Sequence, residues 1–224
     1  MKFDSSIVQT RLASPLGTII IAATSHGLAG LWFDGQRHLP PELTPTLVAS
    51  RTALPPEGAV PPWGGPAAEL APTLVASRTT LPLKGAVLAR GGPSQRTATW
   101  LTDPDHPVLK KVSQQLTEYF AGERTQFDVP LDLAYGTAFQ QSVWQALLKI
   151  PRGVTASYGE VSLRIGKPAA VRAVGAAVGR NPVSIIVPCH RVLGADGSLT
   201  GYAGGLDRKT ALLRLEGVML ESAL

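Results

Sequence analysis

Clusters of apolar residues near the start of the chain predict β-strands. Residues 6–12, 17–24 and 28–33 are rich in Ile, Val, Leu and Thr, and β-branched residues favour the extended conformation. Residues 15–17 and 25–27 separate them and contain the Pro and Gly that are typical of turns. The short separations predict that the strands form an antiparallel meander.

A proline-rich segment interrupts this pattern from about residue 36 to residue 107. Eleven of the 19 prolines fall between Pro40 and Pro93. Residues 42–60 and 69–87 form a direct repeat in which 15 of 19 positions are identical. Two copies are too few for a solenoid with a shared core. Because lengthening a loop costs little closure entropy, we expect a tolerated insertion without chemistry of its own; a partner-binding element is the alternative.

Helical periodicity dominates the rest of the chain. Apolar residues recur every three or four positions between residues 108 and 120, which predicts a helix. Thr137 is placed to cap a second helix. The apolar face of that helix comprises Phe139, Val143, Trp144, Leu147 and Leu148. Residues 183–187 have the composition of a buried strand, and Asp207 is placed to cap a final helix that ends before Gly217.

Two short helices in the last third of the chain have the outline of a helix-turn-helix. The pattern places them at residues 159–165 and 168–179, with Gly166 and Lys167 between them. The second helix is rich in small residues: Ala169, Ala170, Ala173, Gly175, Ala176 and Ala177. Small side chains let a helix backbone approach another surface closely, as in a DNA groove. Close packing against a neighbouring helix explains the same composition.

The overall composition is that of a folded protein with one or two domains. The chain has 224 residues, of which 44% are hydrophobic and 17% are charged, and this balance favours a packed core over disorder. No apolar run approaches the roughly 18 residues of a membrane span. Residues 1–6 also lack the apolar core of a signal peptide. We therefore expect a cytoplasmic location and no membrane partner.

The net charge of +5 is confined to the C-terminal part. Residues 1–134 contain 11 basic and 11 acidic side chains, whereas residues 135–224 contain 10 basic and 5 acidic ones. An excess of positive charge is typical of surfaces that bind a polyanion, above all a nucleic acid. On charge alone, a basic surface that only keeps the protein in solution is an equal alternative.

The single cysteine carries the sharpest chemical signal. Cys189 follows an apolar segment and directly precedes His190. A thiolate is a nucleophile, a histidine can accept the thiol proton, and an acid can orient the imidazole. Glu216, after an apolar helix, is the candidate acid, and Arg191 is placed to lower the pKa of the thiol. A buried structural cysteine is the alternative. One cysteine excludes an intramolecular disulfide and a multi-cysteine zinc site.

Residues 181–192, with the sequence NPVSIIVPCHRV, resemble the active-site segment of the O-6-alkylguanine-DNA alkyltransferases, also called methylated-DNA–protein-cysteine methyltransferases. Further segments agree with that family in order and spacing: residues 157–160, 171–175, 201–205 and 212–217. The resemblance is strong over residues 136–217 and weaker over residues 14–36 and 106–131. Several motifs in register make it specific.

The resemblance implies an α+β protein with two domains. Residues 1–134 would form a small antiparallel-sheet domain of the ribonuclease H-like type, with the proline-rich duplicated insertion at about residues 37–105. Residues 135–224 would form a helical domain that contains the helix-turn-helix, binds DNA and carries out alkyl transfer.

The resemblance also implies roles for individual residues. Cys189 would accept the alkyl group, His190 would deprotonate it through a bound water, and Glu216 would hold His190. Arg172 would enter the base stack and fill the space left by a flipped guanine. Tyr158 would help to rotate that nucleotide and would contact the extruded base.

Four more positions would shape the substrate pocket. Asn181 would brace the turn before the cysteine, and Val192 would help to form the pocket wall. Tyr202 and the backbone after it would face the alkylated oxygen. Ala203 stands where some members of the family have a serine, so a hydroxyl contact is absent at that position.

The implied function is DNA repair by direct reversal of damage. The O-6 atom of guanine lies inside the base pair, so the base must be flipped out of double-stranded DNA before it can react. Transfer of the alkyl group to Cys189 would be irreversible, and each molecule would act once. O-4-alkylthymine is a second candidate substrate. We expect a monomer that needs no cofactor and no metal. The alternatives are a non-catalytic binder of alkylated DNA and a cysteine hydrolase, which would need an oxyanion hole.

Overall fold

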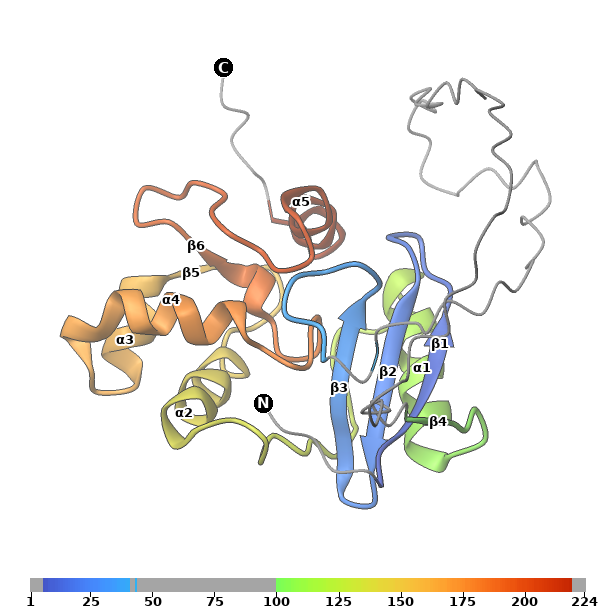
Figure 1. The fold of residues 1–224 in the computed structure, drawn as a ribbon. Coiled ribbons are helices and arrows are strands. Elements are labelled where there is room, and N and C mark those ends of the chain that lie inside the picture. Colours follow the sequence, from blue (N-terminus) through green and yellow to red (C-terminus); the bar gives the residue numbers. More distant parts are fainter. Residues whose placement is uncertain (1–5, 41–42, 44–99, 219–224) are drawn as a thin grey trace, which may run out of the picture. The chain divides into compact units, whose positions relative to one another are not determined.

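A computed structural model describes residues 6–40, 43 and 100–218, which belong to one compact unit (Figure 1). In chain order the elements are β1 (Val8–Leu12), β2 (Ile19–Thr24), β3 (Gly27–Phe33), β4 (Leu101–Thr102), α1 (Pro107–Phe120), α2 (Ala138–Leu147), β5 (Ala156–Ser157), α3 (Tyr158–Arg164), α4 (Val171–Gly179), β6 (Val192–Leu193) and α5 (Leu206–Leu215). Short 3₁₀ turns span Pro168–Ala170 and Cys189–Arg191. The expected α+β fold is confirmed.

The N-terminal strands form the sheet that the apolar clusters predict. Strand β1 pairs antiparallel with β2, and β2 pairs antiparallel with β3, so the meander is confirmed. The strand order is β3-β2-β1-β4. Strand β4 joins β1 in parallel, with Val8 opposite Leu101. The sequence analysis missed β4, because its pairing partner lies on the far side of the proline-rich segment.

Packed structure extends into the range that was assigned to the insertion. Leu43 is 4% exposed and Trp100 is 5% exposed, and both belong to a core cluster on the sheet. The ring of Trp100 lies 6.0 Å from that of Trp32. Leu43 and Trp100, which fall within the predicted insertion at about residues 37–105, are therefore part of the packed core, and the bounds of the insertion stay a prediction. Apart from Leu43, the direct repeat lies outside the described residues.

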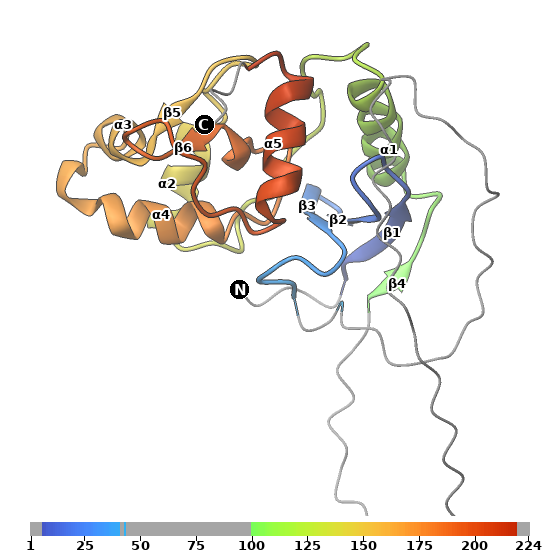
Figure 2. The same cartoon turned by 90° about the horizontal axis from the view of Figure 1, so that it is seen from above.

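Both faces of the sheet are covered. Ile19, Ile21 and Phe33 share the main core with the apolar side of α1, which lies along one face of the sheet (Figure 2). Ile20 and Trp32 point to the opposite face and belong to the second cluster. This alternation follows from the two-residue period of a β-strand. Every residue of β2 and β3 is accordingly buried, and Thr24 is the one polar side chain among them.

Local sequence signals position the C-terminal helices. The predicted N-cap is confirmed: the Thr137 side chain accepts a hydrogen bond from Gln140 N at 3.3 Å, and Gln140 Oε1 accepts one from Thr137 N at 2.9 Å. Helix α3 begins with the same arrangement. Trp144 Nε1 in α2 donates a hydrogen bond to Ala177 O in α4 at 2.9 Å. This buried bond fixes α2 against α4.

The predicted strand at residues 183–187 is wrong. Val183 makes a single bridge to Leu31, and the chain then turns. Ile185 has a φ of 71°, a conformation that strands do not use and that β-branched residues rarely adopt. The apolar run is buried because it forms a compact turn in the core. Apolar composition alone does not separate these two structures.

Three smaller predictions for the helices also need correction. Helix α5 begins at Leu206 after Gly205, whose φ is 94°, and Asp207 makes no capping bond. Leu148 is 37% exposed and lies just beyond α2. The helix expected at residues 168–179 is a 3₁₀ turn followed by α4.

The main core runs across the predicted domain boundary. It contains Tyr119 from the N-terminal side and both Trp144 and Leu212 from the C-terminal side. The division between residues 134 and 135 stays a prediction. In the part of the chain that the structure describes, no helix is long and apolar enough to cross a bilayer.

Candidate active site around Cys189

Cys189 opens a 3₁₀ turn directly after the compact turn at residues 183–187. It is 5% exposed, and its Sγ accepts a hydrogen bond from Asn181 Nδ2 at 3.0 Å. Asn181 Nδ2 also donates to Val187 O at 2.8 Å, and Asn181 Oδ1 accepts from Val183 N at 3.0 Å. Asn181 therefore joins both ends of the turn to the thiol.

The thiol of Cys189 is protonated at neutral pH. Burial raises the pKa of Cys189, because a thiolate is poorly stabilised away from water. The hydrogen bond from Asn181 and the positive charge of Lys209 oppose this effect in part. Formation of the thiolate therefore needs a base close by.

His190, the next residue in the chain, is completely buried. Its Nε2 lies 3.0 Å from Glu216 Oε1, but the ring is not aligned for a hydrogen bond. Nδ1 has no hydrogen-bond partner among the described residues. Burial lowers the pKa of His190, although the carboxylate of Glu216 opposes the shift. The imidazole is therefore neutral at pH 7 and can accept a proton.

Glu216 is held by two further side chains. Arg191 Nε donates to Oε2 at 2.7 Å and Arg191 Nη2 donates to Oε1 at 2.8 Å. Tyr119 Oη donates to Oε1 at 2.8 Å. Burial alone would raise the pKa of Glu216, but the contact with His190 and the hydrogen bonds and positive charge of Arg191 lower it well below its ordinary value. Glu216 is consequently an anion at neutral pH.

Arg191 and Tyr119 have roles that the sequence analysis did not find. Arg191 was expected to lower the pKa of the thiol, and the structure instead pairs it with Glu216. Tyr119 lies on the buried side of α1, and burial, together with the nearby Glu216, raises its pKa. A tyrosine on the apolar face of a predicted helix needs a partner for its buried hydroxyl group. This requirement could have indicated from the sequence that Tyr119 bonds to a buried polar residue.

Lys209 is a buried cation that the sequence analysis also missed. It lies on α5 and is fully buried. Its Nζ donates to Val192 O at 2.6 Å and to Thr200 O at 2.7 Å. Burial lowers the pKa of Lys209 to about 8, and the nearby Cys189 opposes the shift. Lys209 lies on the same face of α5 as the buried Leu212. This spacing could have indicated from the sequence that the lysine is buried.

A glycine-rich segment, residues 200–205, lies beside the cysteine; we call it the pocket loop. Tyr202 in this loop is 9% exposed. Burial raises the pKa of Tyr202, and Cys189 adds to the shift. Tyr158 Oη donates to Gly201 O at 3.5 Å, and Ala203 O accepts from Arg37 N at 3.0 Å.

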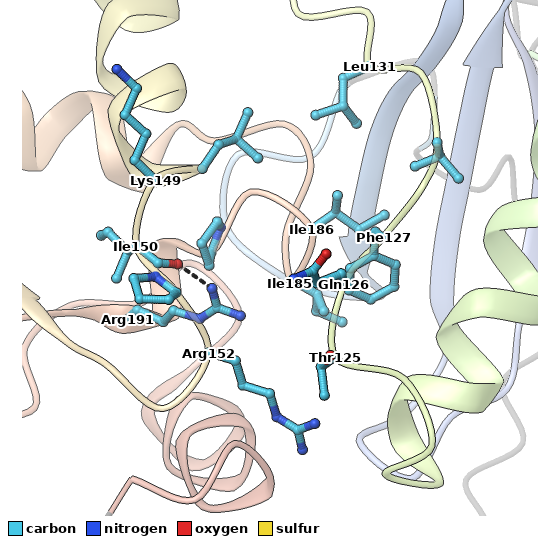
Figure 3. Close-up of a pocket in the computed structure, with 14 residues that line it drawn as sticks. Thr125, Gln126, Phe127, Leu131, Lys149, Ile150, Arg152, Ile185, Ile186 and Arg191 are labelled. Carbon is cyan, nitrogen blue, oxygen red and sulfur yellow. Dashed lines mark hydrogen bonds between the residues drawn. The ribbon is translucent and has the colours of Figure 1, made fainter.

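Two cavities flank this region. One, of about 580 Å³, lies beside the turn that carries Cys189 and is lined by Pro188 and Arg191, though not by Cys189 itself. Figure 3 shows Arg191 in this cavity, with its hydrogen bond to the carbonyl of Ile150. The other, of about 390 Å³, lies between the pocket loop and residues 35–37. The pocket loop therefore has open space on its outer side.

Helix α4 presents an exposed face of small residues. Ala173 and Ala176 on α4, and Ala169 in the preceding 3₁₀ turn, are exposed around Arg172, which is exposed as well. Its buried residues are Val174, Ala177 and Val178. Three of the six small residues are therefore exposed, whereas Ala177 is buried and Ala170 and Gly175 are partly buried. Arg172 does not join the buried group around Cys189. Val192 is buried in β6, directly after the cysteine turn.

No group of three or more metal-binding side chains gathers anywhere in the described residues.

Two family models match the chain. Residues 138–218 match the 6-O-methylguanine DNA methyltransferase, DNA binding domain. Residues 86–133 match the 6-O-methylguanine DNA methyltransferase, ribonuclease-like domain. Asn181, Cys189, His190, Arg191 and Glu216 all lie in the first match, and Tyr119 lies in the second.

Known proteins show the same similarity. The chain is 62% identical over 113 residues to a methylated-DNA–protein-cysteine methyltransferase of Mycobacterium tuberculosis, covering 50% of this chain and 68% of the relative. It is 60% identical over 108 residues to one of Methanosarcina acetivorans, covering 48% and 69%. The crystal structure of Mycobacterium tuberculosis OGT in complex with DNA matches with a TM-score of 0.61 and 39% identity, covering 92% of this chain and 90% of that one.

Proposed function

The chain belongs to the methylated-DNA–protein-cysteine methyltransferase family, and we propose that its Cys189 accepts the alkyl group of O-6-alkylguanine in double-stranded DNA. The protein binds DNA and repairs it by alkyl transfer to a cysteine. The chain has one cysteine. The proposal rests mainly on one observation. His190, the residue that follows this cysteine, is buried in contact with the anionic Glu216.

The chemical step is a displacement at the alkyl carbon. His190 Nδ1 takes the thiol proton through one water, and the Cys189 thiolate attacks the carbon. A new sulfur–carbon bond forms while the carbon–O-6 bond breaks, and its electron pair leaves with guanine. Tyr158 donates a hydrogen bond to the base as charge develops. Because the thioether is stable, each molecule reacts once.

The buried charges around His190 support the proton transfer. The imidazole becomes a cation when it accepts the proton, and the anionic Glu216 at 3.0 Å stabilises that cation. Tyr119 and Arg191 hold Glu216 in place. The cost of burying the carboxylate is thus offset before the reaction begins.

The exposed face of α4 binds DNA while the damaged base is flipped out of the double helix. The O-6 atom is inside the base pair, so the nucleotide must rotate out of the helix. Arg172 then fills the space in the base stack, and Tyr158 turns the nucleotide. The alanines around Arg172 let α4 approach the groove closely. The net charge of +5 adds attraction to phosphates that does not depend on sequence.

The pocket residues orient the flipped base. Asn181 fixes the turn and the thiol, and Val192 forms part of the wall. Tyr202 and the backbone at Ala203 face the alkylated oxygen. O-4-alkylthymine presents a similar alkylated oxygen and is the second substrate that we propose. We propose that the protein acts as a monomer, because Cys189, His190 and Glu216 all come from one chain.

Replacement of the acceptor tests this function. We expect Cys189→Ala to abolish transfer from a duplex that contains O-6-methylguanine, while the dissociation constant for that duplex stays within about twofold, because the flipping residues remain. Fluorescence anisotropy and recovery of the methylated base give the two readouts. Loss of binding together with transfer would instead assign Cys189 a structural role. Binding by the wild-type protein without any transfer would favour a non-catalytic binder of alkylated DNA.

A further inference from the structure

We propose that Arg208 is a positioning residue that couples the N-terminal sheet to the pocket loop and thereby sets the rate of alkyl transfer. This inference rests on the proposed function. Arg208 lies on α5, next to Lys209, and is half-buried. The residue does not touch the reacting atoms, so its effect must pass through the loop beside Cys189.

The guanidinium of Arg208 makes three contacts at once. Its Nε donates to Leu16 O at 2.9 Å, in the turn between β1 and β2. Its Nη1 donates to Gly204 O at 3.0 Å, in the pocket loop. Its central carbon lies 4.7 Å from the centre of the Phe33 ring, at the end of β3. The planar fork of arginine suits such divergent contacts, and lysine cannot reproduce them.

The pocket loop depends on contacts of this kind for its position. Gly201, Gly204 and Gly205 have no side chains with which to pack the loop. A Cβ atom at Gly204 would lie 2.7 Å from the Tyr202 ring and 3.1 Å from the Phe33 ring, so the backbone there must approach both rings closely. Such a loop has high conformational entropy unless other groups hold it.

Besides the hydrogen bond from Tyr158 Oη to Gly201 O, three anchors hold the loop along its length. Lys209 holds its start through Thr200 O, and Arg37 N holds Ala203 O. Arg208 holds its end through Gly204 O. Among the described residues, Arg208 is the one whose side chain hydrogen-bonds both to the loop and to the turn between β1 and β2. The N-terminal sheet therefore acts on the pocket through this side chain.

Tyr202 links the anchor to the chemistry. It lies within the loop, two residues before Gly204, and it belongs to the same buried core cluster as Cys189. Displacement of a pocket wall by about 1 Å can lower a reaction rate about a hundredfold. Release of the loop end would spread Tyr202 over several positions and reduce the fraction of bound bases that are aligned for attack.

The test compares Arg208→Met with Arg214→Met, which changes an exposed arginine on the same helix. Each variant reacts with a duplex that contains O-6-methylguanine and with free O-6-benzylguanine, which needs neither DNA binding nor base flipping. We expect Arg208→Met to lower both second-order rate constants about tenfold, with an unchanged dissociation constant for the duplex. Arg214→Met should react like the wild-type protein.

A second pair of variants separates positioning from general destabilisation. Rates are measured at a temperature at which circular dichroism shows every variant to be folded. Phe33→Leu should also slow both reactions, and the double variant with Arg208→Met should lose less than the product of the two single effects, because the residues act as one unit. If Arg208→Met does not fold, Arg208→Lys provides the same comparison.

The possible outcomes are distinct. Rates for Arg208→Met within twofold of the wild type, or above it, would overturn the inference. A loss with the duplex alone, accompanied by weaker binding, would make Arg208 a DNA contact and overturn it as well. Failure of the wild-type protein to react with either substrate would refute the proposed function itself, which is a different result.

Discussion

Glu216 is the residue on which the charge balance of the buried site depends. It faces His190, Arg191 and Tyr119 at hydrogen-bonding or ion-pair distances, and its side chain is fully buried. Without its charge, the Arg191 guanidinium would be buried with no anion beside it. In the proposed mechanism, the same charge stabilises the imidazolium during proton transfer. Stability and reactivity are therefore coupled at this position.

Glu216→Gln tests that coupling. We expect the free energy of unfolding to fall by about 3 kcal/mol, because one partner of a buried ion pair is removed. We expect the rate of methyl transfer to fall about a hundredfold, because His190 becomes a weaker base. Urea denaturation and single-turnover kinetics measure the two effects. Glu123→Gln, which changes an exposed acid, is the matched control. If Glu216→Gln had as small an effect as this control, the proposed role of Glu216 in stability and reactivity would be contradicted.

His190 makes the stability of the protein depend on pH. Its pKa is lowered in the folded state, whereas an unfolded histidine titrates at about 6.5. As the pH falls below about 6.5, the unfolded chain therefore binds the proton first, and the free energy of unfolding decreases. The lowered pKa of Glu216 adds a second loss below about pH 4.3, where an unfolded glutamate is protonated.

Urea denaturation between pH 5 and pH 7 measures the histidine effect. The wild-type protein should lose stability toward pH 5, and His190→Asn should show a clearly weaker dependence. An identical slope for both proteins would show that another group titrates in this range.

In the proposed mechanism, helix α4 is the element that contacts DNA. It starts after a short 3₁₀ turn, and its exposed residues include Arg172 and several alanines. Its buried side packs on α2, where the Trp144 indole bonds to the Ala177 carbonyl. A rigid helix with a smooth outer face can place one long side chain into the base stack without displacing the rest of the domain.

Arg172→Ala tests this role of α4. We expect transfer from the duplex to slow at least about tenfold, because nothing compensates for the unstacking of the guanine. The reaction with free O-6-benzylguanine should not change. Arg180→Ala, at the exposed other end of the same helix, is the control. Equal losses with both substrates would show that Arg172 acts on the pocket instead of the base stack.

The elements divide into those that local sequence specifies and those that it does not. The cap at Thr137 and the extent of α1 follow from neighbouring residues, and they were predictable. Strand β4 and the turn at residues 183–187 depend on pairing with Val8 and Leu31, which are distant in the chain. The apolar composition of residues 183–187 therefore predicted their burial correctly. It predicted a strand, however, where the structure has a turn.

The same division applies to the site. Cys189, His190 and Glu216 were recognisable from a short motif and its resemblance to a family, and the structure brings His190 and Glu216 together. Tyr119 could not be found in this way, because it reaches Glu216 from 97 residues earlier in the chain. Lys209 was missed for a related reason, since nothing local shows which backbone carbonyls a buried lysine meets.

At the scale of the whole molecule, the N-terminal and C-terminal parts share one core and one site. Leu31 in β3 accepts a hydrogen bond from Ser184 N at 2.9 Å, in the turn before the cysteine. Tyr119 reaches Glu216 from α1, and Arg208 reaches Leu16 from α5. The N-terminal part therefore supports the reactive centre from three directions.

The mass of the intact protein tests the central claim most directly. The protein is incubated with an excess of duplex that contains O-6-methylguanine, and its mass is recorded before and after. The account predicts that one hydrogen is replaced by one methyl group, on the peptide that contains Cys189, and that the reaction then stops. An unchanged mass in a protein that still binds the duplex, or a methyl group on any other residue, would contradict it.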